Sequence, residues 1–205
     1  MKDPRRFAAA LRRLGLSEDL WAGGRQVHGA RIRAVLRPSA PREFPATDGL
    51  LTDRPGLALR VFAADCVPVF LHDPDSGVIA LLHAGWRGVR AKILTRALGL
   101  FSRRRGRPAR IWVTLGPRIR ECCYEVGADV SRFFKPGGRV LRPSIGKPGK
   151  FRLDLAAALR AEARRAGVTR FSAAPWCTAC DPRFYSYRRD RTDERQAALL
   201  ALGAR

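Results

Sequence analysis

The sequence predicts one domain of mixed α/β architecture. Its 205 residues, 46% of them hydrophobic, are enough for a substantial core. Apolar runs rich in Val, Ile, Leu and Phe alternate with segments of helical periodicity, and no repeat at a fixed period and no low-complexity segment interrupts them. This alternation of strands and helices favours helices packed on sheets.

The first quarter of the chain is predicted to contain one helix and one strand. Residues 5–16 carry apolar side chains at helical spacing, and the pattern stops near Gly15. Residues 32–36 are predicted to form a strand. Residues 37–45 contain three prolines and are expected to form a loop that leads to a turn at residues 47–49.

The most informative segment contains two apolar runs about a turn. Residues 57–71 and 77–83 are predicted to form an antiparallel hairpin, because residues 73–77 between them favour chain reversal. Cys66 lies nine positions before the centre of the turn and His83 eight after it. We therefore expect the two side chains to lie opposite each other to within about one residue. Opposed Cβ atoms are roughly 4.5–5.5 Å apart, which would let a thiolate and an imidazole share one metal ion.

The remaining elements follow from the same rules. Asp154 is expected to cap a helix that Gly167 ends. Residues 136–150, with three prolines and four glycines, are expected to be the least regular part of the chain. The predicted helices cover residues 86–101, 155–166 and 196–202, and the predicted strands cover residues 110–115 and 171–176.

The chain is strongly basic, with a formal net charge of +22. Such a charge would suit nucleic acid, because a basic surface gains affinity for polyphosphate by releasing counterions. However, only five of the 40 basic residues are lysines, and the arginines are spread along the chain with one dense cluster at residues 103–107. We interpret this as compositional bias of a GC-rich genome, so a nucleic-acid partner is not expected. The alternative is a surface that suits anionic ligands such as phosphate or nucleotides.

The sequence contains no signal for export or membrane insertion. Arginines interrupt the apolar residues near the N-terminus, and no run approaches the ~20 apolar residues of a membrane span. We therefore expect a cytoplasmic protein with no membrane partner. In a reducing compartment its five cysteines are expected to be thiols, metal ligands or core residues.

The three histidines define the candidate metal site. His72 lies beside the predicted turn and is expected to face solvent, whereas His28 and His83 each lie close to a glycine at a predicted strand end. Together with Cys66 they make a set of three mixed ligands, which suits catalytic zinc because its fourth position stays open. Zinc also lowers the pKa of a bound water toward neutrality. Copper suits the same ligands, and the sequence does not choose between the two metals.

A second group of cysteines gives a weaker metal prediction. Cys177 and Cys180 have C-x-x-C spacing and could join Cys122 and Cys123 in a structural zinc site. Side chains of adjacent residues diverge in extended backbone, so we favour packing for the adjacent pair. The segment also faintly resembles the zinc nucleobase deaminases, but no histidine is followed two residues later by glutamate, which excludes that class.

Six motifs together resemble the YfiH family, also called the polyphenol oxidoreductase or laccase-domain family. The motifs are QVHG at 26–29, TDGLLTDRPGLAL at 47–59, ADCVPV at 64–69, HAGWRG at 83–88, LGPRIRECCYEVG at 115–127 and CTACDPRFYSYRRD at 177–190. The resemblance implies an α+β fold, a layered α/β sandwich with mixed, largely antiparallel sheets, similar to the cytotoxic-necrotizing-factor fold. It implies a zinc site at His28, Cys66 and His83, which would be the catalytic residues.

The same resemblance implies an activity. Family members are described as purine nucleoside phosphorylases that act on adenosine, inosine and methylthioadenosine, with adenosine deaminase activity and, in some accounts, copper-dependent oxidation of phenols. The expected partners are therefore a purine nucleoside and phosphate, whereas the oligomeric state is not predicted.

The sequence departs from the family pattern at two places. A strand and a T-R-x-G-G-V-S type loop precede the helix that residues 5–14 match, and the sequence begins after that point. We therefore expect a single YfiH-like domain of residues 1–205 that is short at its N-terminus; if the loop helps to hold phosphate, activity would be impaired. Residues 191–196 lack the glycine-containing turn of the family, although Arg195 and Gln196 remain.

Four side chains are candidates for binding the substrate. Arg87 opens the predicted helix and is assigned to phosphate, because the free N–H groups of a helix start also bind anions. Tyr185, Tyr187 and Arg188 are assigned to the purine pocket, where the rings would stack on the base. For each of them a structural role is the alternative.

Two further hypotheses follow from the residues. In deamination Asp65 could move a proton, but strand alternation should point its side chain away from Cys66. A non-catalytic basic protein that binds nucleotides or nucleic acid is the alternative from another class. A copper phenol oxidoreductase is a third, although three histidines cannot supply the histidine-rich ligand set of a multicopper centre.

Overall fold

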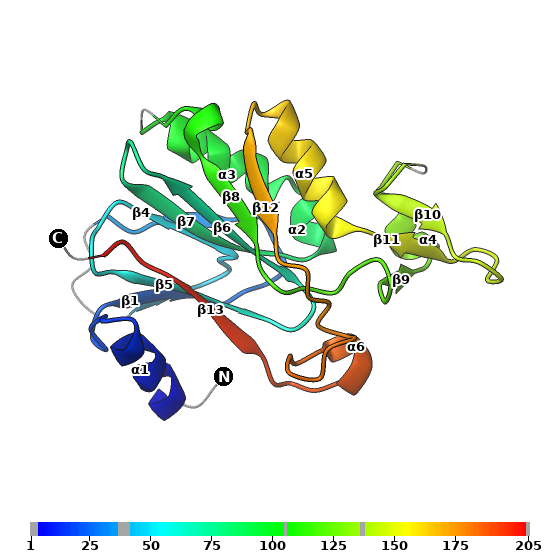
Figure 1. Ribbon diagram of the computed structural model, residues 1–205, viewed down its shortest axis with the longest axis horizontal. Helices are drawn as coiled ribbons and strands as arrows, with labels where there is room; N and C mark the ends of the chain where they lie inside the picture. The colour runs from blue at the N-terminus through cyan, green and yellow to red at the C-terminus, as the bar shows by residue number, and fades with distance from the viewer. Residues whose placement is uncertain (1–3, 37–41, 105, 136–137, 204–205) are drawn as a thin grey trace.

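Four layers stack in the computed structural model, which describes residues 4–36, 42–104, 106–135 and 138–203. Helices cover one face of a six-stranded sheet, a four-stranded sheet packs on its other face, and the N-terminal helix lies on the far side of the smaller sheet (Figure 1). The layered fold with mixed sheets predicted from the family resemblance is therefore confirmed.

The six-stranded sheet forms the centre of the molecule. Its strands, in spatial order, are β12 (Arg170–Ala173), β8 (Trp112–Leu115), β6 (Val67–Asp73), β7 (Val78–Ala84), β4 (Gly49–Thr52) and β2 (Ile32–Ala34). The two outer pairs, β12 with β8 and β4 with β2, are parallel, whereas the three inner pairs are antiparallel.

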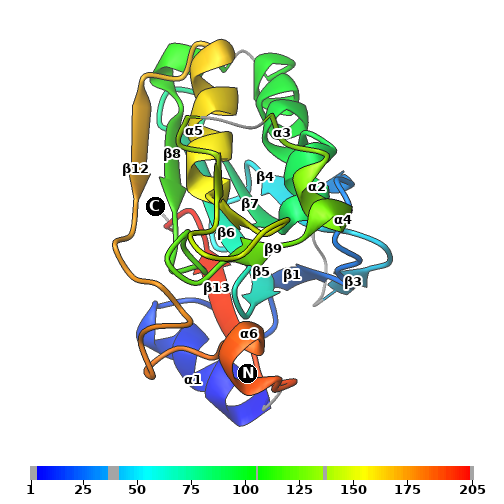
Figure 2. The ribbon, with the colours of Figure 1, turned by 90° about the vertical axis from the view of Figure 1, so that its right-hand side faces the viewer.

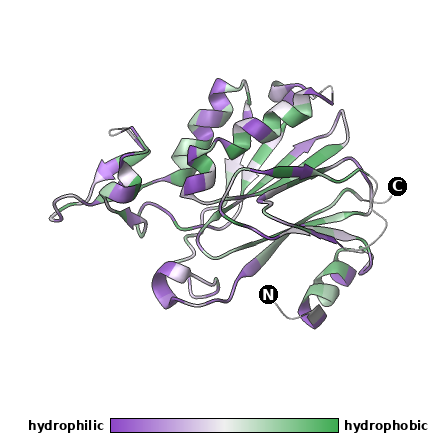
Figure 3. Cartoon of the chain, turned by 180° about the vertical axis from the view of Figure 1, so that it is seen from behind, coloured by the Kyte–Doolittle hydropathy of each residue, from purple (hydrophilic) through white to green (hydrophobic). Residues whose placement is uncertain are grey.

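The four-stranded sheet faces it. Its order is β13 (Gln196–Leu200), β5 (Ala58–Ala63), β1 (Trp21–Gly24) and β3 (Arg42–Phe44). Leu59 and Val61 of β5 pack between the sheets against Ile79 and Leu81 of β7, and all four are buried. Fully burying a side chain of this size contributes about 1.5–3 kcal/mol, so this layer holds the two sheets together. Figure 3 shows hydrophobic residues concentrated on the strands and α6 largely hydrophilic.

Helices cover the outside of both sheets. α1 packs on the smaller sheet through Phe7 and Leu11, and α3 packs on the larger sheet through Ile93 and Phe101. A small sheet at one end of the molecule, beside α4, comprises β10 (Leu141–Pro143), β11 (Phe151–Leu153) and β9 (Glu125–Val126); Figure 1 shows it at the right, and Figure 2 views that end. The helices are α1 (Pro4–Arg13), α2 (Trp86–Arg90), α3 (Ile93–Ser102), η1 (Pro108–Arg110), α4 (Ala128–Ser131), α5 (Leu155–Arg165) and α6 (Tyr187–Asp190).

Several predicted elements are present with shifted ends. The first helix, the strands near residues 32–36, 110–115 and 171–176, and the 155–166 helix all form. The Asp154 carboxylate accepts a hydrogen bond of 3.0 Å from the Ala157 N–H, as expected of an N-cap. Of the predicted 37–45 loop, residues 37–41 lie outside the described residues and the next three form β3. Arg105 of the arginine cluster and residues 136–137 of the irregular segment also lie outside them.

Three predicted elements differ from the structure. The apolar run 57–71 is not one strand, because β5 and β6 belong to different sheets and the chain crosses between them at residues 64–66. The predicted 86–101 helix breaks at Lys92, whose φ of 62° lies in the left-handed region. The predicted final helix is the strand β13, since antiparallel pairing with β5 outweighs the helix propensity of Ala and Leu.

No helix in the described ranges is both long and apolar enough to cross a bilayer.

Candidate metal centre

The hairpin of β6 and β7 positions two of the three candidate ligands. Pro68 pairs with His83, so Cys66 lies two residues from the position opposite His83, one more than the sequence predicted. A shift of two residues keeps both side chains on the same face of the hairpin. Cys66 itself lies where the chain crosses from one sheet to the other.

His28 is the third candidate ligand and comes from the loop after β1. Its φ of 59° is unusual for a residue with a side chain, and the buried Asp48 carboxylate holds the loop in this conformation. Oδ1 of Asp48 accepts from the His28 N–H at 2.9 Å, and Oδ2 accepts from the N–H groups of Val27 at 3.1 Å and Gly29 at 2.8 Å.

Asp48 also orients His83. Its Oδ1 lies 2.9 Å from Nδ1 of His83, which assigns the proton to Nδ1 and leaves Nε2 as the ligand atom. Burial raises the pKa of Asp48, but hydrogen bonds from His83 and the Gly29 and Val27 N–H groups outweigh it, so the pKa lies below its ordinary value. The sequence analysis did not identify this residue. The available signal was an aspartate in the predicted turn at residues 47–49.

Cys66 and His83 have strongly shifted pKa values. Burial raises the pKa of Cys66, but hydrogen bonds with His28 and His83 outweigh it and lower the pKa to about 6. Burial lowers the pKa of His83, whereas Asp48 and Cys66 together raise it to about 9. Between these values the metal-free pair is a thiolate beside an imidazolium.

The three ligand atoms fit one metal ion. They all lie within 4.8 Å of one another, and the rings of His28 and His83 have centroids 4.9 Å apart. A Cβ added to Gly85 would lie 2.9 Å from Sγ of Cys66, so glycine is needed to leave room for the sulfur. A thiolate and two imidazoles suit zinc or copper, and three ligands leave a position open.

The cluster opens into a cavity of about 630 Å³, which is within the usual range for small-molecule sites. Side chains from both sheets and from the segment around α6 surround it. The cavity is lined by Gly24, Arg25, Gln26, His28, Glu43, Phe62, Ala63, Ala64, Asp65, Cys66, His83, Trp86, Arg87, Ile119, Tyr124, Tyr187, Arg188, Arg191 and Arg195.

Three of the four predicted substrate residues line this cavity. Arg87 lies beside Trp86 with its guanidinium carbon 4.4 Å from the ring centroid, and Tyr187 lies at the start of α6. Arg188 also lines the cavity, although its Nη1 donates to the carbonyls of neighbouring loops. Tyr185 is outside the lining, and its backbone N–H donates to Oε1 of Gln196 at 2.9 Å.

The geometry around Asp65 favours a structural role over the proton transfer considered for deamination. Its φ of 86° removes it from regular strand alternation, and it lines the cavity. Oδ1 accepts from Oγ1 of Thr178 at 2.7 Å, and Oδ2 accepts from the Arg188 N–H at 2.7 Å. Both oxygens therefore attach the 178–188 segment to the sheet crossing beside Cys66.

Comparison with known families identifies a match over almost the whole chain. A family model described as "Multi-copper polyphenol oxidoreductase laccase" matches residues 4–203.

Two curated relatives carry the same activity in their names. A protein of Corynebacterium glutamicum named purine nucleoside phosphorylase is 35% identical, covering 98% of this chain and 83% of its own. A purine nucleoside phosphorylase of Deinococcus radiodurans is 40% identical over 90% of this chain and 70% of its own.

The fold of this chain is similar to those of two solved structures. The Bacillus licheniformis hypothetical protein YfiH superposes with a TM-score of 0.89 at 30% identity, covering 97% of this chain and 80% of its own. YlmD from Geobacillus stearothermophilus has a TM-score of 0.88 at 33% identity, covering 98% and 79%.

Proposed function

The chain belongs to the laccase-like YfiH family of polyphenol oxidoreductases, and from this premise we propose that it is a zinc-dependent purine nucleoside phosphorylase. The proposed substrates are adenosine, inosine and methylthioadenosine. In the reaction the bond between C1′ of the ribose and the purine nitrogen breaks, a bond from C1′ to a phosphate oxygen forms, and the purine takes up a proton.

One observation carries the proposal. The His28, Cys66 and His83 ligand atoms open into a cavity whose lining combines several arginines with aromatic rings. Arginine is suited to phosphate because its guanidinium makes paired hydrogen bonds, and aromatic faces are suited to a purine. The cavity volume of about 630 Å³ is within the usual range for a small-molecule site.

Arg87 is the proposed phosphate ligand. Its side chain is exposed and lines the cavity, and it lies in α2, four residues after His83 of β7. A phosphate held there would be fixed relative to the ribose carbon, and such positioning removes much of the entropic cost of a two-substrate reaction.

Tyr187 and Arg188 are the proposed purine wall. Tyr187 is 47% exposed, and the guanidinium carbons of Arg191 and Arg195 lie 5.3 and 5.8 Å from its ring centroid, so the base would approach the exposed part of a ring that already contacts two cations. The Trp86 ring contributes a second aromatic surface and is itself stacked on Phe133 at 5.7 Å.

His28, Cys66 and His83 would hold zinc, with Asp48 fixing the orientation of His83. When bound, the ion supplies Lewis-acid polarisation in the cavity. The chain's own residues bind and orient the substrates and exclude part of the solvent, since Tyr124 and Ile119 are among the residues that line the cavity.

The copper-dependent oxidation of phenols that the family name suggests is less well supported for this chain. The chain has three histidines, and His72 lies in β6, outside the described three-ligand cluster. A multicopper centre needs more imidazoles than this cluster offers. Adenosine deaminase activity uses the same substrate and site, so one assay separates it from phosphorolysis.

The test is product analysis after incubation of the zinc-loaded protein with adenosine, with and without phosphate. Phosphate-dependent release of adenine and ribose 1-phosphate is expected. Inosine formed in both samples would replace the proposal by deamination, and no product in either would reject the substrate assignment. Cys66→Ala protein purified in the same way is the control against a contaminating phosphorylase, and His72→Ala is its matched control.

A further inference from the structure

Four cysteines outside the cavity come together in space. Cys122 and Cys123 lie in a turn before β9, and Cys177 and Cys180 lie in a turn after β12. All four Sγ atoms lie within 4.8 Å of one another. Sγ of Cys180 is 3.3 Å from that of Cys123 and 3.7 Å from that of Cys122. The cluster therefore joins two turns that are far apart in the sequence.

Turn geometry explains how two adjacent cysteines take part. The N–H groups of Cys123 and Tyr124 both donate to the Arg120 carbonyl, at 3.0 and 2.9 Å, so the backbone is tightly curved here. The divergence expected of neighbouring side chains applies to extended backbone and not to this turn. Cys122 and Cys180 are exposed, so packing in the core, which the sequence favoured for the adjacent pair, does not account for the cluster.

The backbone is arranged to support negative charge on sulfur. The Arg120 N–H points at Sγ of Cys177 at 3.4 Å. Burial raises the pKa of Cys177, but the N–H groups of Arg120, Cys180 and Ala179 outweigh it and lower the pKa to about 7.

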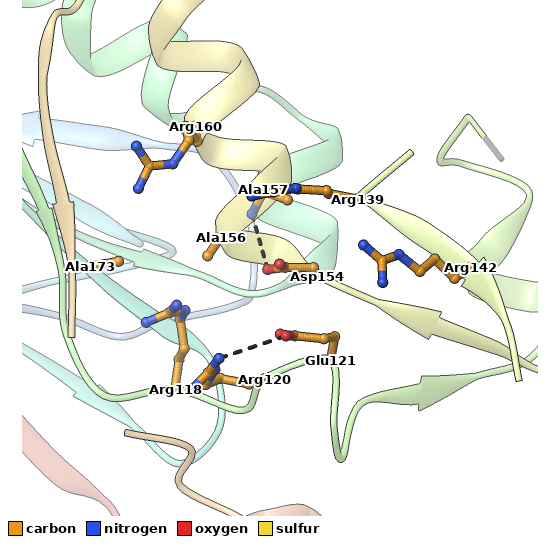
Figure 4. Close-up of a pocket in the computed structure, with 10 residues that line it drawn as sticks. All are labelled: Arg118, Arg120, Glu121, Arg139, Arg142, Asp154, Ala156, Ala157, Arg160 and Ala173. Carbon is orange, nitrogen blue, oxygen red and sulfur yellow. Dashed lines mark hydrogen bonds and ion pairs between the residues drawn. The ribbon is translucent and has the colours of Figure 1, made fainter. Parts of the chain in front are cut away.

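Guanidinium groups surround the two turns. Nη1 of Arg152 donates to the Cys122 carbonyl at 2.7 Å, and Nη1 of Arg188 donates to the Cys123 carbonyl at 3.2 Å. The segment that leads into Cys122 also borders a cavity of about 370 Å³. Figure 4 shows that the two carboxylates lining it, Glu121 and Asp154, are outnumbered by its arginines, which are Arg118, Arg120, Arg139, Arg142 and Arg160. Four thiolates around a divalent cation carry a net charge of −2, which this surrounding positive charge offsets.

We propose that Cys122, Cys123, Cys177 and Cys180 bind a second zinc ion, in a structural site separate from the cavity. Tetrahedral zinc with Zn–S distances near 2.3 Å places its sulfurs about 3.8 Å apart, comparable with the 3.7 Å between Cys122 and Cys180. One disulfide would engage only two of the sulfurs, and two disulfides would draw the sulfurs into separate pairs instead of bringing all four together. Convergence of all four on one point favours the metal.

The ion would fix one wall of the cavity. Arg188 connects the two regions, because its Nη1 donates to the carbonyls of Cys123 and Glu125 while its N–H donates to Oδ2 of Asp65. Thr178, between the two cysteines of the C-x-x-C motif, donates to Oδ1 of the same aspartate. The four-cysteine site therefore holds the segment that carries Tyr187 without contributing a ligand to the cavity cluster.

Zinc content per chain tests the proposal. The protein is purified with reductant, reconstituted with zinc and freed of excess metal. Two ions per chain are expected for the wild type, one for Cys66→Ala, one for Cys180→Ser and none for the double variant. A single ion in the wild type that is lost in Cys66→Ala and unchanged in Cys180→Ser would overturn the proposal.

A second measurement does not depend on the folding of a cysteine-cluster variant. X-ray absorption at the zinc edge of Cys66→Ala, which keeps all four cysteines, should show a shell of sulfur alone at about 2.3 Å. A shell containing nitrogen or oxygen would contradict the four-cysteine site. An intact mass two or four hydrogens below that of the reduced chain, recorded on protein purified with reductant, would show one or two disulfides and would also overturn the proposal.

Discussion

The two ligand clusters of this chain differ in composition and in surroundings. The cavity cluster has two imidazoles and one thiolate and opens into a space of about 630 Å³. The cysteine cluster has four sulfurs from two turns. Three ligands leave an open position for chemistry, whereas four sulfurs complete the coordination of zinc. In the proposed assignment, the number of ligands separates a reactive site from a structural one within the same chain.

The clusters also differ in how their ligands are held. A buried carboxylate, Asp48, binds the backbone of His28 and the ring of His83 in the cavity cluster. In the cysteine cluster, backbone N–H groups approach Cys177, and guanidinium groups hold the carbonyls of the turns. A carboxylate that hydrogen-bonds to an imidazole orients the ring and makes it a stronger metal ligand. Backbone N–H groups and guanidinium groups hold the cysteine turns in place.

The largest expected effect is a loss of turnover when a ligand of the cavity cluster is removed. Cys66→Ala should remove the cavity metal and lower turnover by at least about a thousandfold, because several kcal/mol of transition-state stabilisation are lost. The fold should be retained. Steady-state kinetics and circular dichroism check this, and zinc still bound in the cavity by Cys66→Ala would contradict the ligand assignment.

The next effect is on stability and concerns the other cluster. An ion that joins Cys122 to Cys177 closes a long loop, and such a cross-link contributes about 4 kcal/mol in the chain-entropy model. For a chain of this size the loss corresponds to a Tm lower by roughly 8–16 °C. Cys180→Ser should show this fall in calorimetry with the cavity ion still bound. A Tm equal to that of the wild type would remove the structural role.

Predictability from sequence also differs between the clusters. Cys66 and His83 were placed together because a hairpin has a register that turn residues fix, and the observed two-residue offset keeps both side chains on one face. The cysteine cluster depends on a turn at Cys122 and on contact between distant segments, neither of which local spacing encodes.

The errors in the fold have the same physical origin. The strand β13 has a helix-favouring sequence, and its conformation comes from pairing with β5. The run 57–71 is largely apolar because both of its strands are buried, and the single acidic residue at the crossing, Asp65, was too weak a sign to divide it. Asp48 was missed because its role depends on two loops that meet only in the folded chain.

The carboxylate behind the cavity cluster gives the third prediction. Asp48→Asn should weaken zinc binding by about 10–100-fold, the usual cost of losing a carboxylate that orients a metal-bound histidine. Competition with a chelator of known affinity measures it, in a Cys180→Ser background so that one site is observed. Asp53→Asn, in an exposed loop, is the control. Unchanged affinity in Asp48→Asn would show that His83 is oriented by packing alone.

The Cys180→Ser background also allows the pH dependence of zinc affinity at the cavity cluster to be measured. Metal binding at His83 requires loss of the Nε2 proton, and the pKa of this histidine is about 9 while that of Cys66 is about 6. The metal-free state binds more protons than the metal-bound state, so affinity should rise with pH, about tenfold per unit between pH 6 and 9. The rise should be steeper below pH 6, where Cys66 also loses a proton, and should end above pH 9. Isothermal titration at several pH values checks this, and a constant affinity from pH 6 to 9 would contradict the thiolate–imidazolium pair.

The smallest expected effect concerns phosphate in the cavity. Arg87→Ala should raise the KM for phosphate by roughly tenfold or more, since a hydrogen bond to a charged group contributes about 1.5–3 kcal/mol. The KM for the nucleoside should change little. Arg90→Ala is the matched control, because Arg90 is also exposed on α2 but lies over Phe133, with its guanidinium carbon 3.6 Å from that ring centroid, and does not line the cavity. Equal KM values for the two variants would remove Arg87 from the phosphate site. A fall in kcat at saturating phosphate would instead show that the Arg87 guanidinium stabilises the transition state. Such an effect is expected only at the cavity, where the reaction takes place, and not at the four-cysteine site.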